Sequence, residues 1–317
     1  MSTSGETIPV IGYGPVGQQT GKLLVDKGYS VRAIQRSPPA HLPQGASFVR
    51  ADATDTDSLI PALAGARTVI LALGLPYDGK VWAQGWPKAM SAVLGACEQT
   101  GARLVYADSL YLYGPQNRPL TEDLPPVDYG RKPTARSNAT RLWQRAFVEG
   151  RVMTAAVRAP DFYGPGVTTS ILGAVTLGRL AQRKPAQILA SADHLHDVVH
   201  VKDFARALVT LAEASDDAFG QAWHVPTPPT LTLRGIIAIA AAALAVPARI
   251  SVVPVWQARL AGLFLPEVRE AAEMHFLTDR AYLVDSSKFR ERFWSDNLPL
   301  EDSVAEAALS FRHASGR

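Results

Sequence analysis

Three glycines near the N-terminus constrain the fold of this chain more than any other feature. Gly12, Gly14 and Gly17 form a G-x-G-x-x-G pattern where an apolar segment gives way to an amphipathic one. The surrounding segments read as strand, helix and strand, at residues 9–11, 18–27 and 30–34. In that context Gly12 permits a tight turn, Gly14 lets the backbone approach a pyrophosphate, and Gly17 lets the helix pack on the sheet. The pattern predicts a βαβ dinucleotide-binding unit; a glycine-rich turn that only permits close packing is the alternative.

The start of the helix supplies the other half of the predicted phosphate site. Backbone N–H groups in the first turn of a helix lack intrahelical acceptors and carry partial positive charge, which favours a bound phosphate. The residues predicted to contact the cofactor phosphates are Gly12, Gly14, Pro15, Val16 and Gly17.

The end of the second strand predicts which cofactor is bound. An NAD site usually has Asp or Glu there, about 20 residues past the glycines, to hold the ribose 2′-hydroxyl, whereas an arginine accommodates a 2′-phosphate. This chain has Gln35 followed by Arg36. We therefore predict NADP(H) in preference to NAD(H). The alternative is that Arg36 is a solvated arginine at a strand end.

The composition is typical of a compact soluble protein. The 317 residues are 47% hydrophobic and 19% charged, with a formal net charge of +3 and no block of like charges, so we expect no nucleic-acid partner. No apolar run reaches the roughly 18 residues that a membrane span needs, and the N-terminal residues show no signal-peptide pattern. We therefore expect a cytoplasmic protein without a membrane partner. We also expect no metal site. The single cysteine, Cys97, reads as a packed thiol on a helix.

Further strands follow the first unit, and their carboxyl ends are predicted to face the cofactor. Residues 66–76 form a near-continuous apolar run, as expected for a strand buried on both faces of a parallel sheet. The residues expected near the cofactor at strand ends are Asp52, Ala53, Ala72, Leu73 and Gly74. Residues 77–86 are predicted to form a loop over the site, and residues 87–100 a helix that Gly101 closes.

The order of the later motifs resembles a known superfamily. Ser109 stands four residues before Tyr113 in D-S-L-Y-L-Y-G, residues 158–166 read R-A-P-D-F-Y-G-P-G, and residues 196–208 read H-D-V-V-H-V-K-D-F-A-R-A-L. Together with the glycine loop, these segments are similar to the extended short-chain dehydrogenase/reductase superfamily, in particular its NAD-dependent epimerase/dehydratase branch. The resemblance implies an α/β fold, with a Rossmann-type doubly wound parallel sheet and a smaller C-terminal substrate-binding lobe.

The resemblance also implies domain boundaries and an assembly. A dinucleotide-binding domain is expected at residues 1–165, with residues 195–220 returning to it, and a substrate-binding lobe at residues 166–194 and 221–317. The helices at residues 87–100 and 134–149 correspond to those that often pair in this superfamily. A homodimer is therefore expected.

The catalytic pair of the superfamily is altered in this chain. Members carry Tyr-x-x-x-Lys on the helix after the serine strand, where the tyrosine transfers a proton and the lysine holds the ribose. The aligned residues on the helix at 134–149 are Ser137 and Arg141, so the tyrosine is missing. Arg141 can still hold the ribose as a permanent cation, whereas Ser137 cannot replace a phenol as a general acid. Tyr129 is a candidate displaced acid/base, although the fourth residue after it is Pro133, so no helical pair forms.

Other residues of these motifs are candidates for the reaction site. Ser109 and Tyr111 are predicted to take part in catalysis and to contact the substrate, and Tyr77 to form a wall of the pocket. Arg158 suits either an acidic group of the substrate or the pinning of its own loop. Asp161 completes the predicted substrate set.

Three functions from different classes remain open. The first is an NADP(H)-dependent oxidoreductase or epimerase acting on a small, sugar-like hydroxyl or carbonyl substrate, because the cofactor carries the hydride and the protein positions it. The second is an NADP(H)-binding regulatory protein without turnover, which the missing tyrosine favours. The third is a non-redox lyase, isomerase or cyclase on the same scaffold.

Overall fold

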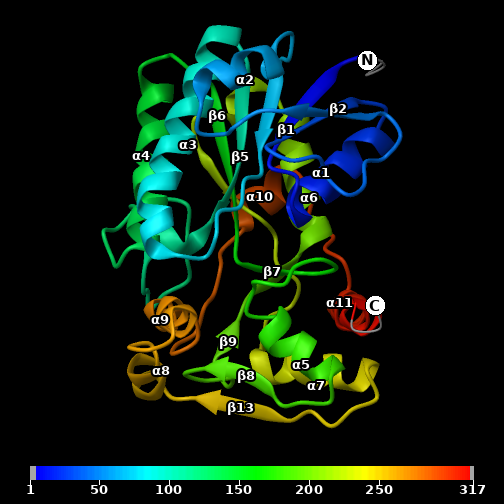
Figure 1. Ribbon diagram of the computed structural model, residues 1–317, viewed down its shortest axis with the longest axis vertical. Helices are drawn as coiled ribbons and strands as arrows, with labels where there is room; N and C mark the ends of the chain where they lie inside the picture. Colours follow the sequence, from blue (N-terminus) through cyan, green and yellow to red (C-terminus); the bar gives the residue numbers. More distant parts are fainter. Residues whose placement is uncertain (1–4, 315–317) are drawn as a thin grey trace. The chain divides into compact units, whose positions relative to one another are not determined.

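A seven-stranded sheet carries the glycine loop. In the computed structural model, which describes residues 5–314, the strand order is β3-β2-β1-β4-β5-β6-β11 (Figure 1). The strands are β1 (Thr7–Ile11), β2 (Ser30–Gln35), β3 (Ala46–Arg50), β4 (Thr68–Leu71), β5 (Arg103–Ser109), β6 (Thr154–Ala159) and β11 (Ala222–His224). The pairs β1–β2, β2–β3, β1–β4 and β4–β5 are parallel. The strand order reverses between β1 and β4, which is where open α/β sheets bind ligands.

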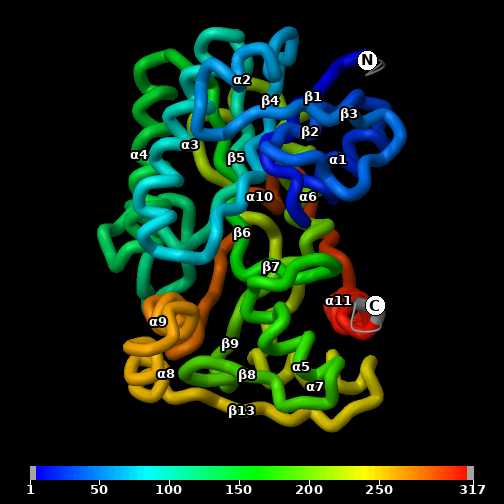
Figure 2. The backbone as a smooth tube through the Cα atoms, in the orientation of Figure 1, coloured from blue at the N-terminus to red at the C-terminus, as the bar shows by residue number. Residues whose placement is uncertain are grey.

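Helices cover both faces of this sheet. They are α1 (Pro15–Asp26), α2 (Thr56–Leu63), α3 (Gly79–Thr100), α4 (Lys132–Val148) and α6 (Val201–Glu213). Helices α2, α3 and α4 lie on one face, and α1 and α6 lie on the other (Figure 2). The predicted fold class, a Rossmann-type doubly wound sheet followed by a smaller C-terminal region, is confirmed.

The apolar pattern of the sequence accounts for the core of this sheet. All four residues of β4 are buried, as predicted for a strand covered on both faces. Cys97 on α3 is buried too, which confirms the predicted packed thiol, and burial raises the pKa of this thiol to about 12. Gly101 closes α3 with a φ of 71°, as predicted.

Helix α3 begins earlier than the sequence predicted. The expected loop at residues 77–86 is wrong, because α3 starts at Gly79 and contains Pro87 in its interior. The Asp78 side chain accepts hydrogen bonds from two N–H groups of the first turn, at 2.7 and 3.0 Å. Trp82 and Trp86 in the first half of the helix are buried. Capping and aromatic burial thus stabilise helical turns ahead of the proline.

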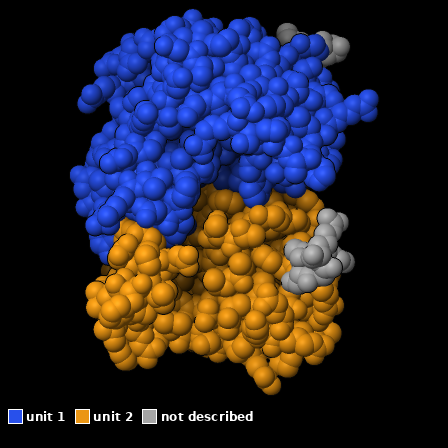
Figure 3. Space-filling model, in the orientation of Figure 1, with its two compact units in different colours: residues 1–112, 125–158, 204–223 blue, residues 113–124, 159–203, 224–317 orange. Residues whose placement is uncertain are grey.

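The chain forms two compact units (Figure 3). Unit 1 comprises the described residues up to 112, together with 125–158 and 204–223, and unit 2 comprises 113–124, 159–203 and the described residues from 224 onward. The units differ from the predicted domain boundaries. Residues 113–124, 159–165 and 195–203 were predicted for the first domain and group with unit 2, and residues 221–223 were predicted for the lobe and group with unit 1.

Unit 2 has its own small sheets and its own core. Its strands are β7 (Asp161–Tyr163), β8 (Ala186–Leu189), β9 (Leu195–His196), β10 (Val198–His200), β12 (Leu231–Thr232) and β13 (Ile250–Val253). Its helices are α5 (Arg179–Ala181), α7 (Leu233–Ala243), α8 (Val255–Ala261), α9 (Pro266–Glu273), α10 (Ser287–Arg292) and α11 (Leu300–Ala314). Strands β7 and β10 pair in parallel, as do β8 and β13, whereas β9 and β12 are antiparallel. The core holds buried side chains of α7, α11 and β8, including Ile236, Val304 and Ile188.

Over residues 5–314, no helix is both long enough and apolar enough to span a membrane.

Candidate functional site

The three glycines of the loop between β1 and α1 meet different steric demands. Gly12 has a φ of 87°, and a Cβ atom there would lie 2.6 Å from the carbonyl oxygen of Ala72. A Cβ atom at Gly17 would collide with the carbonyl oxygen of Gly12, so the helix approaches the loop itself more closely than a side chain permits. A Cβ atom at Gly14 would meet no protein atom within 4 Å. The loop therefore leaves open space at the glycine that is predicted to face a pyrophosphate.

The first turn of α1 is suited to hold an anion. Gly14 is the N-cap of this 12-residue helix and contributes no side-chain acceptor, and Pro15 occupies the first helical position. Val16 and Gly17 supply the first N–H groups of the turn. Their partial positive charge points along the helix axis toward the open space at Gly14, so the residues present fit a dinucleotide phosphate.

Gln35 at the end of β2 ties down the glycine loop. Its Oε1 accepts a hydrogen bond of 3.2 Å from the Tyr13 backbone N–H, and its Nε2 donates one of 2.7 Å to the Ser37 carbonyl oxygen. This amide places no negative charge where an NAD site has a carboxylate. Arg36 follows it and is exposed.

In the strand order β4 lies next to β1, which carries the loop, whereas β3 is separated from β1 by β2. Asp52 is half-buried, and the hydrogen bond donated by the Thr54 backbone N–H lowers the pKa of its carboxyl, with smaller contributions in the same direction from Arg36 and Lys88. The Ala72 backbone N–H donates to the Ile11 carbonyl oxygen at 2.8 Å and so joins the end of β4 to β1. The remaining predicted residues of these strand ends are Ala53, which is buried, Leu73, which is half-buried, and Gly74, which is exposed.

A buried ion-pair network lies at the end of β5. The carboxylate of Asp108 has no exposed surface and contacts two guanidinium groups, Arg136 Nη2 at 3.2 Å and Arg158 Nε at 3.1 Å. The Ser109 backbone N–H also donates to Asp108 Oδ1 at 2.8 Å, and the Ser109 side-chain oxygen accepts from Arg136 Nε at 3.1 Å. The predicted substrate residue Arg158 is thus a partner of Asp108, and Arg136 is the side chain that contacts Ser109.

Aromatic rings surround the Arg136 guanidinium. Its central carbon lies 3.9 Å from the Trp86 ring centroid, 5.4 Å from that of Tyr106 and 5.8 Å from that of Trp82. Tyr111, a predicted substrate residue, stacks on Trp82 with a centroid distance of 6.3 Å. The rings present π-faces to the cation, so cation–π attraction as well as ion pairing holds Arg136 in place.

Tyr77 belongs to the same aromatic group. Its ring meets Trp82 edge-on at 5.6 Å, and the Lys132 ammonium lies 4.6 Å from its centroid. Lys132 is fully buried and stands four residues before Arg136 on α4. Lys132 and Arg136 therefore have the four-residue spacing of the superfamily's Tyr-x-x-x-Lys pair, five residues before Ser137 and Arg141, where the sequence alignment placed that pair.

The aligned residues Ser137 and Arg141 lie elsewhere. The Ser137 hydroxyl is buried and donates to the Val127 carbonyl oxygen at 2.7 Å. Arg141 is exposed, with its Nη1 2.8 Å from Asp128. Successive residues of a helix point about 100° apart, and Ser137 and Arg141 follow Arg136 by one and five positions. They therefore point in other directions than Arg136, the residue of α4 that contacts Ser109. Tyr129 is half-buried in the segment before α4.

Asp161, the last predicted substrate residue, lies in unit 2. Its carboxylate contacts His196 Nε2 at 2.9 Å, and both side chains are buried. The His196 ring stacks on Tyr282 at 5.1 Å. Asp161 therefore forms a buried contact with His196 inside unit 2.

Sequence reasoning missed Arg136, Lys132 and Asp108. The spacing of Lys132 and Arg136 was visible in the sequence, since a pair of cations four residues apart lies on one helical face. The sequence did not show which face of α4 meets β5.

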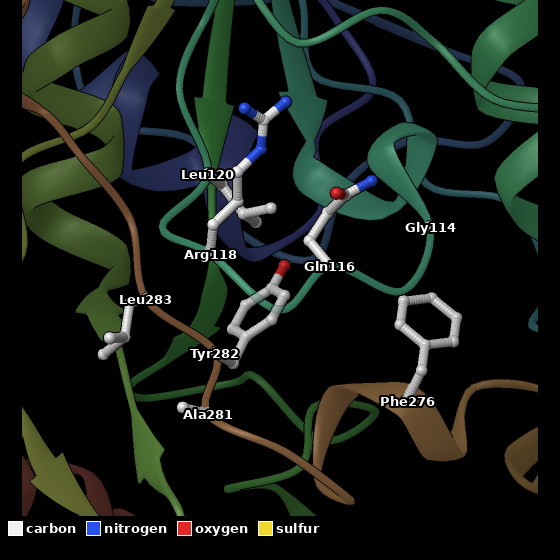
Figure 4. A pocket seen from close by; sticks show the side chains of 8 residues that line it. All are labelled: Gly114, Gln116, Arg118, Leu120, Phe276, Ala281, Tyr282 and Leu283. Carbon is white, nitrogen blue, oxygen red and sulfur yellow. The ribbon is translucent and has the colours of Figure 1, made fainter.

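Unit 2 contains a small open hollow of about 10 Å³ (Figure 4). It is lined by Gly114, Gln116, Arg118, Leu120, Phe276, Ala281, Tyr282 and Leu283. The Tyr282 hydroxyl points toward the segment that carries Gln116 and Arg118, and it is buried without a hydrogen-bond partner among the described residues. Burial raises the pKa of Tyr282 well above its ordinary value, so this phenol stays protonated.

Comparison with known proteins identifies the family to which the chain belongs. The sequence matches the model of the NAD dependent epimerase/dehydratase family over residues 8–225. The match spans more than half of the chain, and the chain belongs to that family. A comparison of the sequence with curated proteins found no match.

Several solved structures share the fold. UDP-glucuronic acid 4-epimerase from Bacillus cereus, in complex with NAD, is 16% identical with a TM-score of 0.80, and the match covers 97% of this chain and 99% of that one. DesIV, a dTDP-glucose 4,6-dehydratase from Streptomyces venezuelae with NAD bound, is 15% identical with a TM-score of 0.80 and 98% coverage of both chains. UDP-glucose 4-epimerase from Thermus thermophilus, in complex with NAD, is 17% identical with a TM-score of 0.77, covering 97% of this chain and 99% of that one. At these identities the likeness shows the fold alone.

Proposed function

We propose that this protein binds NADP(H) at the glycine loop and acts as an oxidoreductase or epimerase on a small hydroxyl or carbonyl compound. The observation that carries the proposal is the open space at Gly14, which faces an uncapped helix N-terminus. The NAD in the solved relatives supports a nicotinamide dinucleotide as the ligand.

The residues at the end of β2 support NADP(H) over NAD(H). Gln35 offers no carboxylate to accept hydrogen bonds from a ribose 2′-hydroxyl, and its Oε1 is already bonded to the loop. A carboxylate at this position would repel a 2′-phosphate, and the uncharged Gln35 amide does not. The exposed Arg36 guanidinium is a cation that can pair with the 2′-phosphate.

The Ser109 and Arg136 pair offers hydrogen bonds to a substrate oxygen but no general acid or base. When bound, the cofactor supplies the hydride chemistry. An arginine stays protonated, so Arg136 neither accepts the proton of an alcohol nor gives one to an alkoxide. Its N–H groups can stabilise a substrate oxygen that carries negative charge, and the proton is exchanged with water. The fold relatives act on UDP-glucuronic acid, UDP-glucose and dTDP-glucose by their names, and we propose a sugar-like substrate on that analogy.

One observation favours a second function, an NADP(H)-binding regulatory protein without turnover. The group that contacts Ser109 is a guanidinium and not a phenol. A general acid or base contributes about 10² to 10⁴-fold to a rate, so its loss is compatible with a retained binding site and little turnover.

The homodimer is also a proposal, through the outer faces of α3 and α4. Light scattering of the purified protein is expected to give a mass of twice 34.1 kDa. A mass of 34.1 kDa would contradict it.

The test of the cofactor proposal is a fluorescence titration with NADPH and with NADH. We expect tighter binding of NADPH, and a loss of about tenfold in NADPH affinity in Arg36→Ala with NADH affinity unchanged, because only NADPH carries the 2′-phosphate. Arg145→Ala, which removes an exposed arginine of α4, is the matched control. Binding of neither nucleotide would mean that the glycine loop is structural and would remove the redox proposal.

A further inference from the structure

The Arg136 side chain has one nitrogen without a protein partner. Arg136 Nε donates to Ser109 and Nη2 contacts Asp108, whereas Nη1 is buried and has no hydrogen-bond acceptor among residues 5–314. The residue as a whole is 5% exposed. A buried guanidinium N–H without an acceptor is rare, because leaving it unpaired forfeits its hydration.

A second unpaired donor lies beside it. The Trp86 indole Nε1 is also buried and has no acceptor in the described part of the chain. The Trp86 ring centroid lies 3.9 Å from the Arg136 guanidinium carbon. Indole and guanidinium nitrogens can only donate hydrogen bonds, so Trp86 and Arg136 each have a buried N–H group that lacks an acceptor.

We propose that Arg136 and Trp86 form a binding point for a carboxylate oxygen of the substrate, next to Ser109. A carboxylate has only acceptor oxygens, and a guanidinium binds it through two parallel N–H groups with charge-assisted hydrogen bonds. Asp108 does not fill this role, since its carboxylate is shared between Arg136 Nη2 and Arg158 Nε.

The location makes the site part of the reaction region. Ser109 accepts from Arg136 Nε, which directs the serine's own O–H away from the guanidinium. Ser109 is half-buried at the carboxyl end of β5, which is the edge at which open α/β sheets bind ligands. This inference rests on the proposed function and narrows it: the substrate is a carbonyl or hydroxyl compound that carries an acid group.

The test uses propionate and its uncharged analogue propionamide as probes. Tryptophan fluorescence of the intact protein is followed while sodium propionate replaces sodium chloride at constant ionic strength, and Trp86 lies close enough to the site to respond. We expect saturable binding of propionate at a concentration about tenfold lower than that of propionamide, because the bond to a charged acceptor is the stronger one. Equal responses to the acid and the amide would overturn the proposal.

Two variants locate the site. Arg136→Lys keeps a cation near Trp86 but loses the planar fork, and we expect propionate binding to weaken at least about tenfold. Arg145→Lys, on the exposed side of the same helix, is the control and should leave propionate binding unchanged. If Arg136→Lys fails to fold, Trp86→Phe removes the indole N–H while keeping an aromatic ring, and calorimetry should show weaker propionate binding. Unchanged affinity in the variant that folds would overturn the assignment.

An NADPH titration of the same samples separates the two proposals. NADPH binding without propionate binding would refute the carboxylate site and leave the cofactor proposal intact. Propionate binding without NADPH binding would support the carboxylate site and refute the cofactor proposal.

Discussion

The glycines of the loop after β1 differ in what a side chain would meet. Gly12 has a left-handed φ of 87°, and a Cβ atom there would lie 2.6 Å from the carbonyl oxygen of Ala72. Gly101 at the end of α3 has a φ of 71°, and a Cβ atom there would meet no atom within 4 Å. The conformational penalty for an L-residue is therefore shared by the two positions, but the collision is found only at Gly12.

This difference gives a matched pair of stability predictions. Gly101→Ala is expected to lower the free energy of unfolding by about 1 kcal/mol, the cost of a left-handed alanine. Gly12→Ala is expected to lower it by roughly 3 kcal/mol or more, since the end of β4 must also move. Urea denaturation followed by circular dichroism measures both. Equal losses would show that the loop can shift at no cost.

At the scale of secondary structure, one buried carboxylate joins three elements. Asp108 on β5 contacts Arg136 of α4 and Arg158 of β6, and all three side chains are at most 6% exposed. The charges have left water, so the geometry of the ion pairs decides whether the network stabilises the fold. An exposed pair, Arg141 of α4 and Asp128 in the segment before that helix, has no such constraint.

Neutralising the shared carboxylate should therefore destabilise the protein strongly. Asp108→Asn leaves two buried guanidinium groups without their common anion, and we expect a loss of about 3 kcal/mol in the free energy of unfolding. Asp128→Asn, the control on the exposed pair, should cost about 0.5 kcal/mol or less. Chemical denaturation of both variants at pH 7 tests this. Similar values for the two would mean that the buried network contributes little.

At the scale of the whole molecule, the two units have separate cores, and their responses to ligand and to pH should differ. The predicted cofactor residues of the glycine loop belong to unit 1. In unit 2, the Nε2 atom of the buried His200 lies 3.6 Å from the Glu306 carboxylate. Burial lowers the pKa of the His200 ring from 6.5 to about 4. The Glu306 charge raises this pKa and the Lys202 charge lowers it, and both effects are smaller than that of burial.

His200 predicts a loss of stability in mild acid. The folded state keeps the ring neutral down to pH about 4, while the unfolded state takes up a proton near pH 6.5, so stability is complete above pH 6.5 and falls as the pH drops toward 4. Between pH 7 and 5 the wild-type protein should lose about 2 kcal/mol more than His200→Gln, which cannot titrate. Urea denaturation at the two pH values measures the difference. A parallel decline in both proteins would assign the acid sensitivity to other groups.

Local interactions let the sequence determine a large part of this protein. The glycine loop, the strand and helix on either side of it, the fully buried β4 and the Gly101 cap follow from spacing and backbone conformation within a few residues. The motif series identified the family, which the match over residues 8–225 confirms. The aromatic and glycine-rich composition of residues 77–86 favours a loop, and this interpretation misplaced the start of α3 at Pro87.

Only the tertiary structure decided which side chains meet at Ser109. Arg136 is 27 positions away and Arg158 pairs with Asp108 across 50 positions. Whether Arg136 or Ser137 faces β5 depends on the rotation of α4 about its axis, and a change of one residue turns a side chain by about 100°. That rotation is set by packing of α4 against α3 and the sheet, which bury Ala135, Ala139 and Trp143 in a common core. The local sequence predicts the helix but not its rotation, because the contacts that determine the rotation come from segments far apart in the chain.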